Sequence, residues 1–306
     1  MKLIGENIHI ISKNVQKALL EKDKEYITSL INIQKNMDYA DLNAGPAKGN
    51  FAGILQWLVE LVQENSNLKI SLDTTNTDEM TNALKLCKNP QDTFLNSTSK
   101  DEPRLEKVTN LAAEYNSNVI ALTLSKETGI PKTADGRLEI AFEIYEKCVE
   151  KGIENEKIYF DPLILPVCVE QSQAAEALNT IKMLKESFDP QVNTVIGLSN
   201  ISNGCPLELR PLINRVFAVL AFGAGLDAAI IDAKDTELYR VLRMLETSTP
   251  EKEIDKLYID IASMISDFGE IEDIKYNSED TEQNQIIKTV NILLGKKIYS
   301  HSFTQI

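Results

Sequence analysis

The chain has 306 residues, of which 43% are hydrophobic and 25% are charged. This composition supplies a sizeable core and argues against a wholly disordered chain. The 46 acidic residues outnumber the 32 basic residues, and the formal net charge of −14 disfavours both a nucleic-acid-binding protein and one that docks electrostatically on an anionic membrane.

Targeting and redox signals point to the cytoplasm. No apolar run approaches the ~20 residues of a membrane-spanning helix, and the N-terminus lacks the apolar region of a signal peptide. The four cysteines, Cys87, Cys148, Cys168 and Cys205, are far apart in the sequence and form no Cys-x-x-Cys pair. Because disulfides are rare in reducing compartments, this spacing predicts free thiols in a cytoplasmic protein without a zinc site.

Short apolar runs alternate with segments of helical periodicity along the whole chain. We predict strands at about residues 2–5, 39–43, 68–73, 93–97, 118–124, 157–161, 194–199 and 227–232. Between them, the segment 211–222 is typical of an amphipathic helix that opens with a proline. Asn76-x-x-Glu79 and Ser99-x-x-Glu102 indicate capping boxes at two further helix starts.

Eight strand–helix units predict a parallel sheet, and eight strands close a (β/α)8 TIM barrel of the α/β class. An open nucleotide-binding sheet is disfavoured, since neither its Gly-x-Gly-x-x-Gly nor its Gly-x-x-x-x-Gly-Lys-Ser/Thr motif occurs. We therefore predict a single barrel domain over 1–306. It carries a C-terminal helical and acidic insertion at 247–283, with a helix over 251–268 and an acidic stretch over 269–282, before a last barrel helix at about 284–294. The insertion is either a solvated addition or a partner-docking element.

Polar side chains stand where almost every predicted strand ends, which is where a TIM barrel carries its active site. These residues are Glu6, Asn7, Asp41, Asn43, Asp73, Asn96, Thr123, Asp161, Ser199, Asn200 and Asp232. Asp, Asn, Ser and Thr also cap helices, so each has a purely structural interpretation as well. Asp73, Asn96 and Asp161 lie at the strand ends themselves, too early for a cap, and therefore favour a binding role.

The residue types at the strand ends limit which reactions and ligands the site can support. The two histidines, His9 and His301, lie near the chain ends, so we predict no Ser-His-Asp or Cys-His arrangement. Lys126 and Lys132 follow the fifth strand in a solvated loop, which disfavours a Schiff base. The strand-end aspartates, including Asp41, could hold a divalent metal. Acids and amides together match a flat polar heterocycle better, because they can hydrogen-bond along its edges.

An ordered set of motifs extends this interpretation. It consists of Ile4-Gly5-Glu6, Asp41-Leu42-Asn43-Ala44-Gly45-Pro46, Leu72-Asp73-Thr74-Thr75-Asn76, Asn96-Ser97-Thr98, Thr128-Gly129-Ile130-Pro131-Lys132, Asp161-Pro162-Leu163-Ile164-Leu165-Pro166, Gly197-Leu198-Ser199-Asn200-Ile201-Ser202, Arg210-Pro211-Leu212-Ile213-Asn214-Arg215 and Gly225-Leu226-Asp227-Ala228-Ala229-Ile230. Together these motifs resemble the methyltetrahydrofolate:corrinoid methyltransferases. That family belongs to the pterin-binding barrel superfamily, with dihydropteroate synthase and the folate domain of cobalamin-dependent methionine synthase. The resemblance covers residues 1 to about 246 and resumes at 286–303.

The resemblance implies an enzyme that moves a methyl group between N5 of tetrahydrofolate and the cobalt of a corrinoid. It implies that Asp73, Asn96 and Asp161 grip the pterin edge and that Asn200 is the catalytic residue, hydrogen-bonding near N5. Such a donor accelerates the reaction when it binds the transition state more strongly than the ground state. Further substrate-binding candidates are Glu6, Asn43, Ser199, Asn203, Arg210 and Asp232, of which Asn203 and Arg210 fall where the family contacts the rest of the folate.

The resemblance also has consequences for partners. The chain has no Asp-x-His-x-x-Gly motif for a cobalt-ligating histidine, so we expect the cobalamin to arrive on a separate corrinoid protein through a transient interface. Family analogy implies a homodimer in anaerobic one-carbon metabolism. We predict no metal ligands. A catalyst accelerates both directions, so the sequence predicts the reaction and not its direction.

Three alternatives remain. Dihydropteroate synthase is disfavoured, because its strand-seven motif carries a lysine where this chain reads Gly197-Leu198-Ser199-Asn200. A divalent-metal lyase on the same barrel is the second alternative. The third is a folate-binding protein without catalysis.

Overall fold

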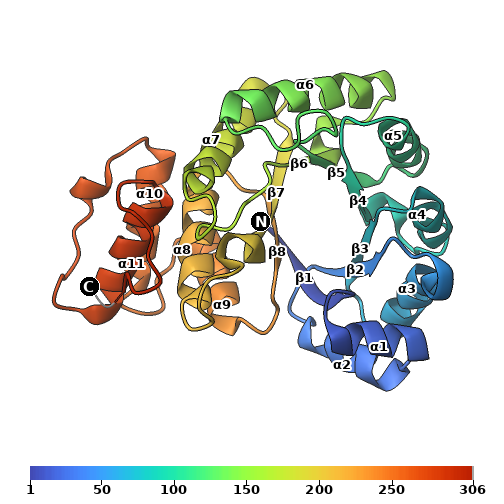
Figure 1. Cartoon of the computed structure of the whole chain (residues 1–306), viewed down its shortest axis with the longest axis horizontal. Coiled ribbons are helices and arrows are strands. Elements are labelled where there is room, and N and C mark those ends of the chain that lie inside the picture. The colour runs from blue at the N-terminus through green and yellow to red at the C-terminus, as the bar shows by residue number, and fades with distance from the viewer. Residues whose placement is uncertain (305–306) are drawn as a thin grey trace.

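The computed structural model describes residues 1–304 and contains a closed barrel of eight parallel strands, which confirms the predicted (β/α)8 TIM barrel (Figure 1). The strands pair in chain order and β8 closes on β1. They are β1 (Lys2–His9), β2 (Tyr39–Gly45), β3 (Lys69–Thr74), β4 (Phe94–Thr98), β5 (Asn118–Leu122), β6 (Ile158–Asp161), β7 (Asn193–Gly197) and β8 (Ala228–Ile231). The helices are α1 (Lys13–Glu21), α2 (Lys24–Ile33), α3 (Ile54–Asn65), α4 (Thr77–Leu84), α5 (Arg104–Tyr115), α6 (Ala134–Glu150), α7 (Ser172–Ser187), α8 (Arg210–Gly223), α9 (Thr236–Thr247), α10 (Asp255–Ser266) and α11 (Thr281–Leu293).

The barrel lumen has an apolar layer and, above it, a polar one. The apolar layer is a separate buried cluster, made of Ile4, Tyr39, Phe94, Ile120, Tyr159, Val195 and Ala228. Side chains alternate between the faces of a strand, so residues two positions further along also face the lumen. These are Glu6, Asp41, Asn96, Leu122, Asp161, Gly197 and Ile230. The polar layer therefore lies at the carboxyl ends of the strands.

The predicted helix over 211–222 is confirmed as α8, with Pro211 in its first turn and Val216 and Leu220 fully buried. The predicted cap at Asn76 is also confirmed, because its side chain accepts hydrogen bonds from the backbone N–H groups of residues 78 and 79. The capping box at Ser99 is wrong. Helix α5 begins only at Arg104, and the Ser99 hydroxyl donates to Asp101 instead.

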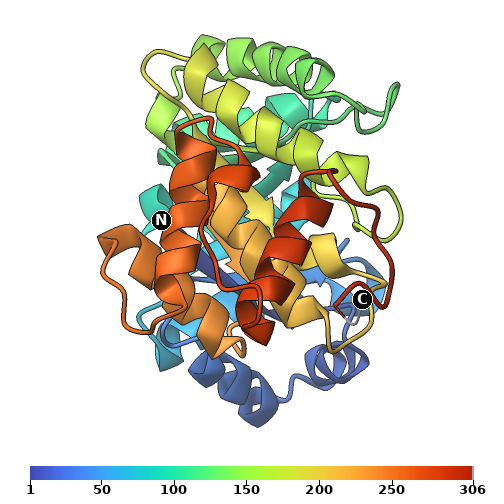
Figure 2. The same ribbon diagram turned by 90° about the vertical axis from the view of Figure 1, so that its left-hand side faces the viewer.

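Helices α10 and α11 pack on α8 outside the ring of barrel helices (Figures 1 and 2). The strand β8 is followed directly by α9, so the two helices come after eight strand–helix units. Gly223 allows a close approach between α8 and α10, since a Cβ there would lie 2.3 Å from the carbonyl oxygen of Ala262. The division of the chain into one barrel domain with an insertion at 247–283 stays a prediction.

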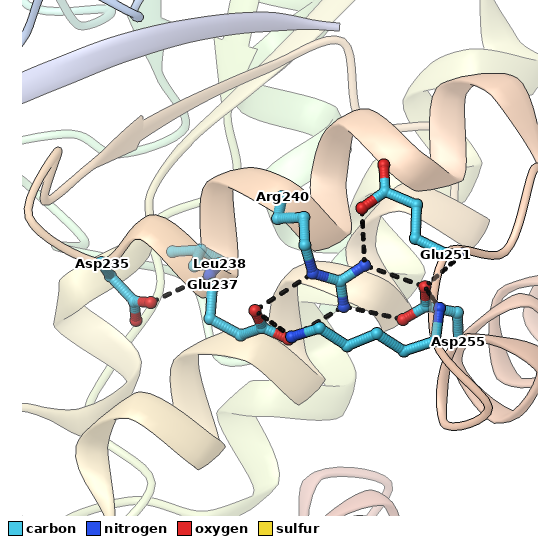
Figure 3. Close-up of polar contacts among 7 residues, drawn as sticks. Asp235, Glu237, Leu238, Arg240, Glu251 and Asp255 are labelled. Atoms are coloured by element: carbon cyan, nitrogen blue, oxygen red, sulfur yellow. Dashed lines mark hydrogen bonds and ion pairs between the residues drawn. The ribbon is translucent and has the colours of Figure 1, made fainter.

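An ion-pair network joins α9 to the start of α10 (Figure 3). The Arg240 guanidinium donates to both carboxylate oxygens of Asp255, at 2.8 and 2.7 Å, and to both oxygens of Glu237. The Asp255 side chain is fully buried. It also accepts the backbone N–H groups of Glu251 and Lys252, so its charge is satisfied by four donors. This network holds the start of α10 against α9, at the point where the C-terminal helices diverge from the barrel.

No helix within residues 1–304 is long and apolar enough to cross a membrane. All four cysteines are free thiols, as the sequence predicts. The cytoplasmic location stays a prediction.

Candidate functional site

The polar layer is densest where β2, β3 and β4 end. Asp41 is 2% exposed and accepts hydrogen bonds from the Ser71 hydroxyl at 2.6 Å and the Asn96 amide at 3.2 Å. The Asn43 amide donates to the Asp73 carboxylate. The structure therefore brings the predicted residues Asn43, Asp73 and Asn96 together around Asp41, which the sequence suggested only as a metal ligand.

Asp41 and Asp73 influence each other's ionisation. Burial raises the pKa of Asp41 well above its usual range, and the nearby charge of Asp73 raises it further. Burial also raises the pKa of Asp73, but hydrogen bonds from Asn43 and Asp41 act in the opposite direction. Like charges this close cannot both ionise readily. Asp41 therefore holds its proton more tightly than Asp73 does, and Asp73 is the more readily ionised of the two.

Asp161 ends β6 and faces the lumen from the other side. Its carboxylate accepts the backbone N–H of Leu163 at 2.8 Å, and its carbonyl oxygen accepts the Thr123 hydroxyl at 3.0 Å. Burial raises the pKa of Asp161 to about 7, although the Leu163 N–H and the Arg137 charge favour the ionised form. The carboxyl can therefore change protonation state near neutral pH.

Arg137 is a site-supporting residue that the sequence interpretation missed. It is 0% exposed, in the first turn of α6, and donates to the Pro131 carbonyl at 3.1 Å and to the Gln173 side chain at 2.6 Å. Its Nη1 has no hydrogen-bond partner within the described residues 1–304. A sequence signal existed, because Arg137 precedes Ile140 on the buried face of a helix, where a charge needs a reason.

Arg104 also escaped the sequence interpretation. It donates to the carbonyl oxygens of Thr74 at 2.8 Å, Thr75 at 2.6 Å and Ser97 at 2.7 Å. These carbonyls belong to the carboxyl ends of β3 and β4 and to the first residue of the loop after β3. Arg104 therefore holds the ends of β3 and β4 in place beside Asp73. No periodicity or motif in the sequence predicts this role.

Asn200 lies on the short 3-10 helix η4 (Leu198–Ser202) that follows β7. Gly197 occupies the lumen position at the end of β7, and a Cβ there would lie 3.1 Å from Asn200 Nδ2. The missing side chain thus leaves room for the Asn200 amide above the polar layer. The amide is exposed and makes no side-chain hydrogen bond in the described part of the chain.

A cavity of about 610 Å³ opens at the mouth between the loops after β1, β7 and β8. Its lining includes the predicted residues Glu6, Ser199, Asn203, Arg210 and Asp232. The Ser199 hydroxyl donates to Glu6 at 2.6 Å. Burial raises the pKa of Glu6 to about 7, the Ser199 hydrogen bond opposes this, and the Asp232 charge adds to it. Arg210 donates through Nε to the Cys205 carbonyl at 2.9 Å.

The structure also places the residues that were considered for a Schiff base and for a metal site. Lys126 and Lys132 are exposed in the loop after β5, as predicted. Over residues 1–304, no three His, Cys, Asp or Glu side chains are arranged to hold a metal ion. His9 lies at the end of β1, where its Nδ1 accepts the backbone N–H of Ile11.

Comparisons with known proteins agree with this geometry. Residues 45–232 match the family model described as pterin binding enzyme. The methylcorrinoid:tetrahydrofolate methyltransferase of Eubacterium limosum is 26% identical over 242 residues, which cover 78% of this chain and 87% of that protein. The methionine synthase of Mycobacterium tuberculosis is 34% identical over 136 residues, which cover 43% of this chain but only 11% of that protein.

Solved structures show the same fold. The dihydropteroate synthase of Coxiella burnetii, determined with pteroic acid, superposes with a TM-score of 0.58 at 17% identity, covering 81% of this chain and 93% of that one. The resemblance predicted from the motifs is therefore confirmed at the level of the superfamily. Because the family model spans more than half of the chain, this protein belongs to the family of pterin-binding enzymes.

Proposed function

We propose that this enzyme transfers a methyl group between N5 of tetrahydrofolate and the cobalt of a corrinoid carried by a separate protein. The observation that carries the proposal is the polar layer at the barrel mouth, where Asp73, Asn96 and Asp161 lie at the carboxyl ends of their strands and the Asn200 amide lies beside Gly197 at the end of β7. The similarity to the Eubacterium limosum methyltransferase over most of both chains supports it.

The lumen residues suit one edge of a pterin. Ionised carboxylates at Asp73 and Asp161 accept N–H groups of the pyrimidine ring, while the Asn96 amide can both donate and accept. Ring N–H donors stabilise the charged form of Asp161, so binding lowers its pKa from about 7. We therefore expect folate affinity to rise with pH up to about that value and to level off above it.

The mouth cavity suits the rest of the folate. Arg210 and Lys234 line it, and guanidinium and ammonium groups pair with the carboxylates of a glutamyl tail. Asn203 lies beside them on the loop after η4 and can donate to the same segment. The tail would thus leave the lumen between the loops after β7 and β8.

Asn200 provides the catalytic hydrogen bond in this proposal. A tertiary amine is a poor leaving group until its nitrogen is protonated or strongly hydrogen-bonded, and the Asn200 Nδ2–H lies at the rim where N5 would face the mouth. An amide cannot deliver a proton itself, so water supplies it while Asn200 stabilises the changing charge. The corrinoid supplies the cobalt centre that accepts or donates the methyl group.

The partner protein and the assembly remain part of the proposal. The corrinoid protein must reach the open mouth, and we expect a transient interface there. The homodimer and the anaerobic setting implied by the family resemblance stay predictions, and so does the cytoplasmic location predicted from the N-terminus and the cysteines.

An anaerobic absorbance assay tests the reaction directly. Protein, methyltetrahydrofolate and cob(I)alamin are mixed, and methylcobalamin formation is followed. We expect transfer by the wild type, a loss of about 10–100-fold in rate for Asn200→Ala with nearly unchanged folate affinity, and no change for Asn179→Ala on the exposed face of α7.

The same assay separates the alternatives. An unchanged transfer rate in Asn200→Ala would remove its catalytic role. Tight folate binding without transfer, even when reduced corrinoid proteins are supplied, would indicate a binding protein. Product formation from a pterin diphosphate and an aromatic amine would instead identify a dihydropteroate synthase, and absence of folate binding would reject the proposal.

A further inference from the structure

Two thiols lie together beside the mouth cavity, although they belong to different loops. Cys168 follows β6, and its Sγ donates to the carbonyl oxygen of Asn203 at 3.2 Å. A Cβ added at Gly204 would lie 3.2 Å from the same sulfur. Burial raises the pKa of the Cys205 thiol, and the neighbouring Cys168 thiol raises it further. The Cys168 sulfur therefore lies against the two residues that precede Cys205, and the two thiols are neighbours across the loops after β6 and η4.

The surroundings of the pair differ for its two members. Cys205 is 2% exposed, whereas Cys168 is only half-buried. Burial raises the pKa of Cys205 and the nearby Tyr299 lowers it, while the Tyr299 backbone N–H donates to Gln171 at 2.8 Å, so the C-terminal tail lies beside the inner thiol. The remaining cysteines, Cys87 and Cys148, are buried in a separate core cluster.

We propose that Cys168 and Cys205 form an oxidisable dithiol, a modification site that closes to an intramolecular disulfide on exposure to a low-molecular-weight disulfide. The Cys168 thiolate attacks one sulfur of the small disulfide, forms a mixed disulfide and expels one small thiol. The Cys205 thiolate then attacks the Cys168 sulfur and expels the second. The protein loses two electrons and two protons, and the small disulfide is reduced to two thiols.

The dithiol is coupled to the residues that line the mouth. The Cys205 carbonyl accepts Arg210 Nε, and the Asn203 carbonyl accepts the Cys168 thiol, whose hydrogen is lost when the disulfide forms. Closing the bond shifts the segment that holds Arg210 and Asn203 in place. Resting on the proposed function, this predicts that the oxidised protein binds methyltetrahydrofolate about five- to tenfold more weakly, the size of one lost hydrogen bond.

The test uses the full chain treated with oxidised glutathione, followed by alkylation and peptide mapping by mass spectrometry. The wild type should yield one linked peptide pair containing Cys168 and Cys205, reversible with dithiothreitol. Cys205→Ala should stop at a glutathione adduct on Cys168, and Cys168→Ala should acquire neither. Cys87→Ala serves as the matched control and should form the same linked pair as the wild type.

Each possible result of these experiments either supports or overturns the proposal. Glutathione adducts on the wild type without the linked peptides would overturn the proposal. The wild-type map needs no variant to fold. Folate affinity is measured separately on reduced and oxidised protein: equal dissociation constants would remove the coupling to the mouth, whereas a reduced protein that binds no folate would refute the proposed function and leave the thiol result standing.

Discussion

Replacing Asp161 by asparagine tests whether burying this carboxyl group in the site costs the protein folding stability when the group is ionised. Burial raises the pKa of this carboxyl from the ordinary 3.8 to about 7, so the folded protein holds the proton more tightly than the unfolded chain does. The associated stability is fully present below about pH 4 and is lost as the pH rises through about 7. The asparagine side chain keeps an acceptor for the Leu163 N–H but does not titrate.

The size of the effect follows from the shift. The rise in pKa corresponds to about 4 kcal/mol in total, of which about 2–3 kcal/mol falls between pH 5 and pH 8. Water at the barrel mouth reduces this, and we expect about 1–2.5 kcal/mol. Relative to Asp161→Asn, the wild type should therefore lose that much unfolding free energy between the two pH values.

Urea unfolding at pH 5 and pH 8 measures the difference, with Asp260→Asn on the exposed surface of α10 as the matched control. The same variant should bind folate about 10–100-fold more weakly, because a neutral amide accepts ring N–H groups less well than a carboxylate. Identical pH dependence of stability in wild type and variant would refute the reasoning about burial. Unchanged folate affinity would instead refute the role of Asp161 in binding.

Three further perturbations probe other parts of the structure. Asp255→Asn removes the buried partner of Arg240 and should lower the unfolding free energy by about 2–3 kcal/mol in urea titrations at neutral pH, and a loss below 0.5 kcal/mol would contradict the assigned network. Gly223→Ala forces a Cβ against the Ala262 carbonyl, so thermal unfolding should show a loss of about 1–3 kcal/mol, which an unchanged melting temperature would disprove. Arg137→Gln removes a buried positive charge and should raise the pH midpoint of folate binding above about 7, whereas an unshifted profile in fluorescence titrations would show that the charge does not reach the site.

Much of the fold follows from short-range pattern. Apolar runs separated by helical periodicity predicted eight strands at nearly their observed places. Each predicted strand contains most of its observed counterpart, except that the range 2–5 covers only half of β1. The ends were less accurate where side chains serve other parts of the molecule. Ser99 looked like a helix cap, but it bonds Asp101, which in turn accepts the backbone N–H of Lys126 and joins the loops after β4 and β5.

The candidate site, like the fold, could be predicted from the sequence only in part. The strand-end positions of Asp73, Asn96 and Asp161 could be predicted, because a polar residue at the end of an apolar strand is visible in the sequence, and their binding role stays a prediction. The partners of Arg104 and Arg137 could not be predicted, since Thr75 and Gln173 lie far from these arginines in the chain and become their neighbours only when the barrel closes.

The sequence by itself thus determined the order of strands and helices and the kinds of polar groups at the strand ends, because these depend on the local alternation of side chains. Tertiary structure alone decided which of those groups meet, how deeply they are buried and how their pKa values shift. It placed Asn200 in the space above Gly197, and it set Cys168 against Cys205. Proximity and desolvation arise from the packing of segments far apart in the chain, which no local pattern encodes.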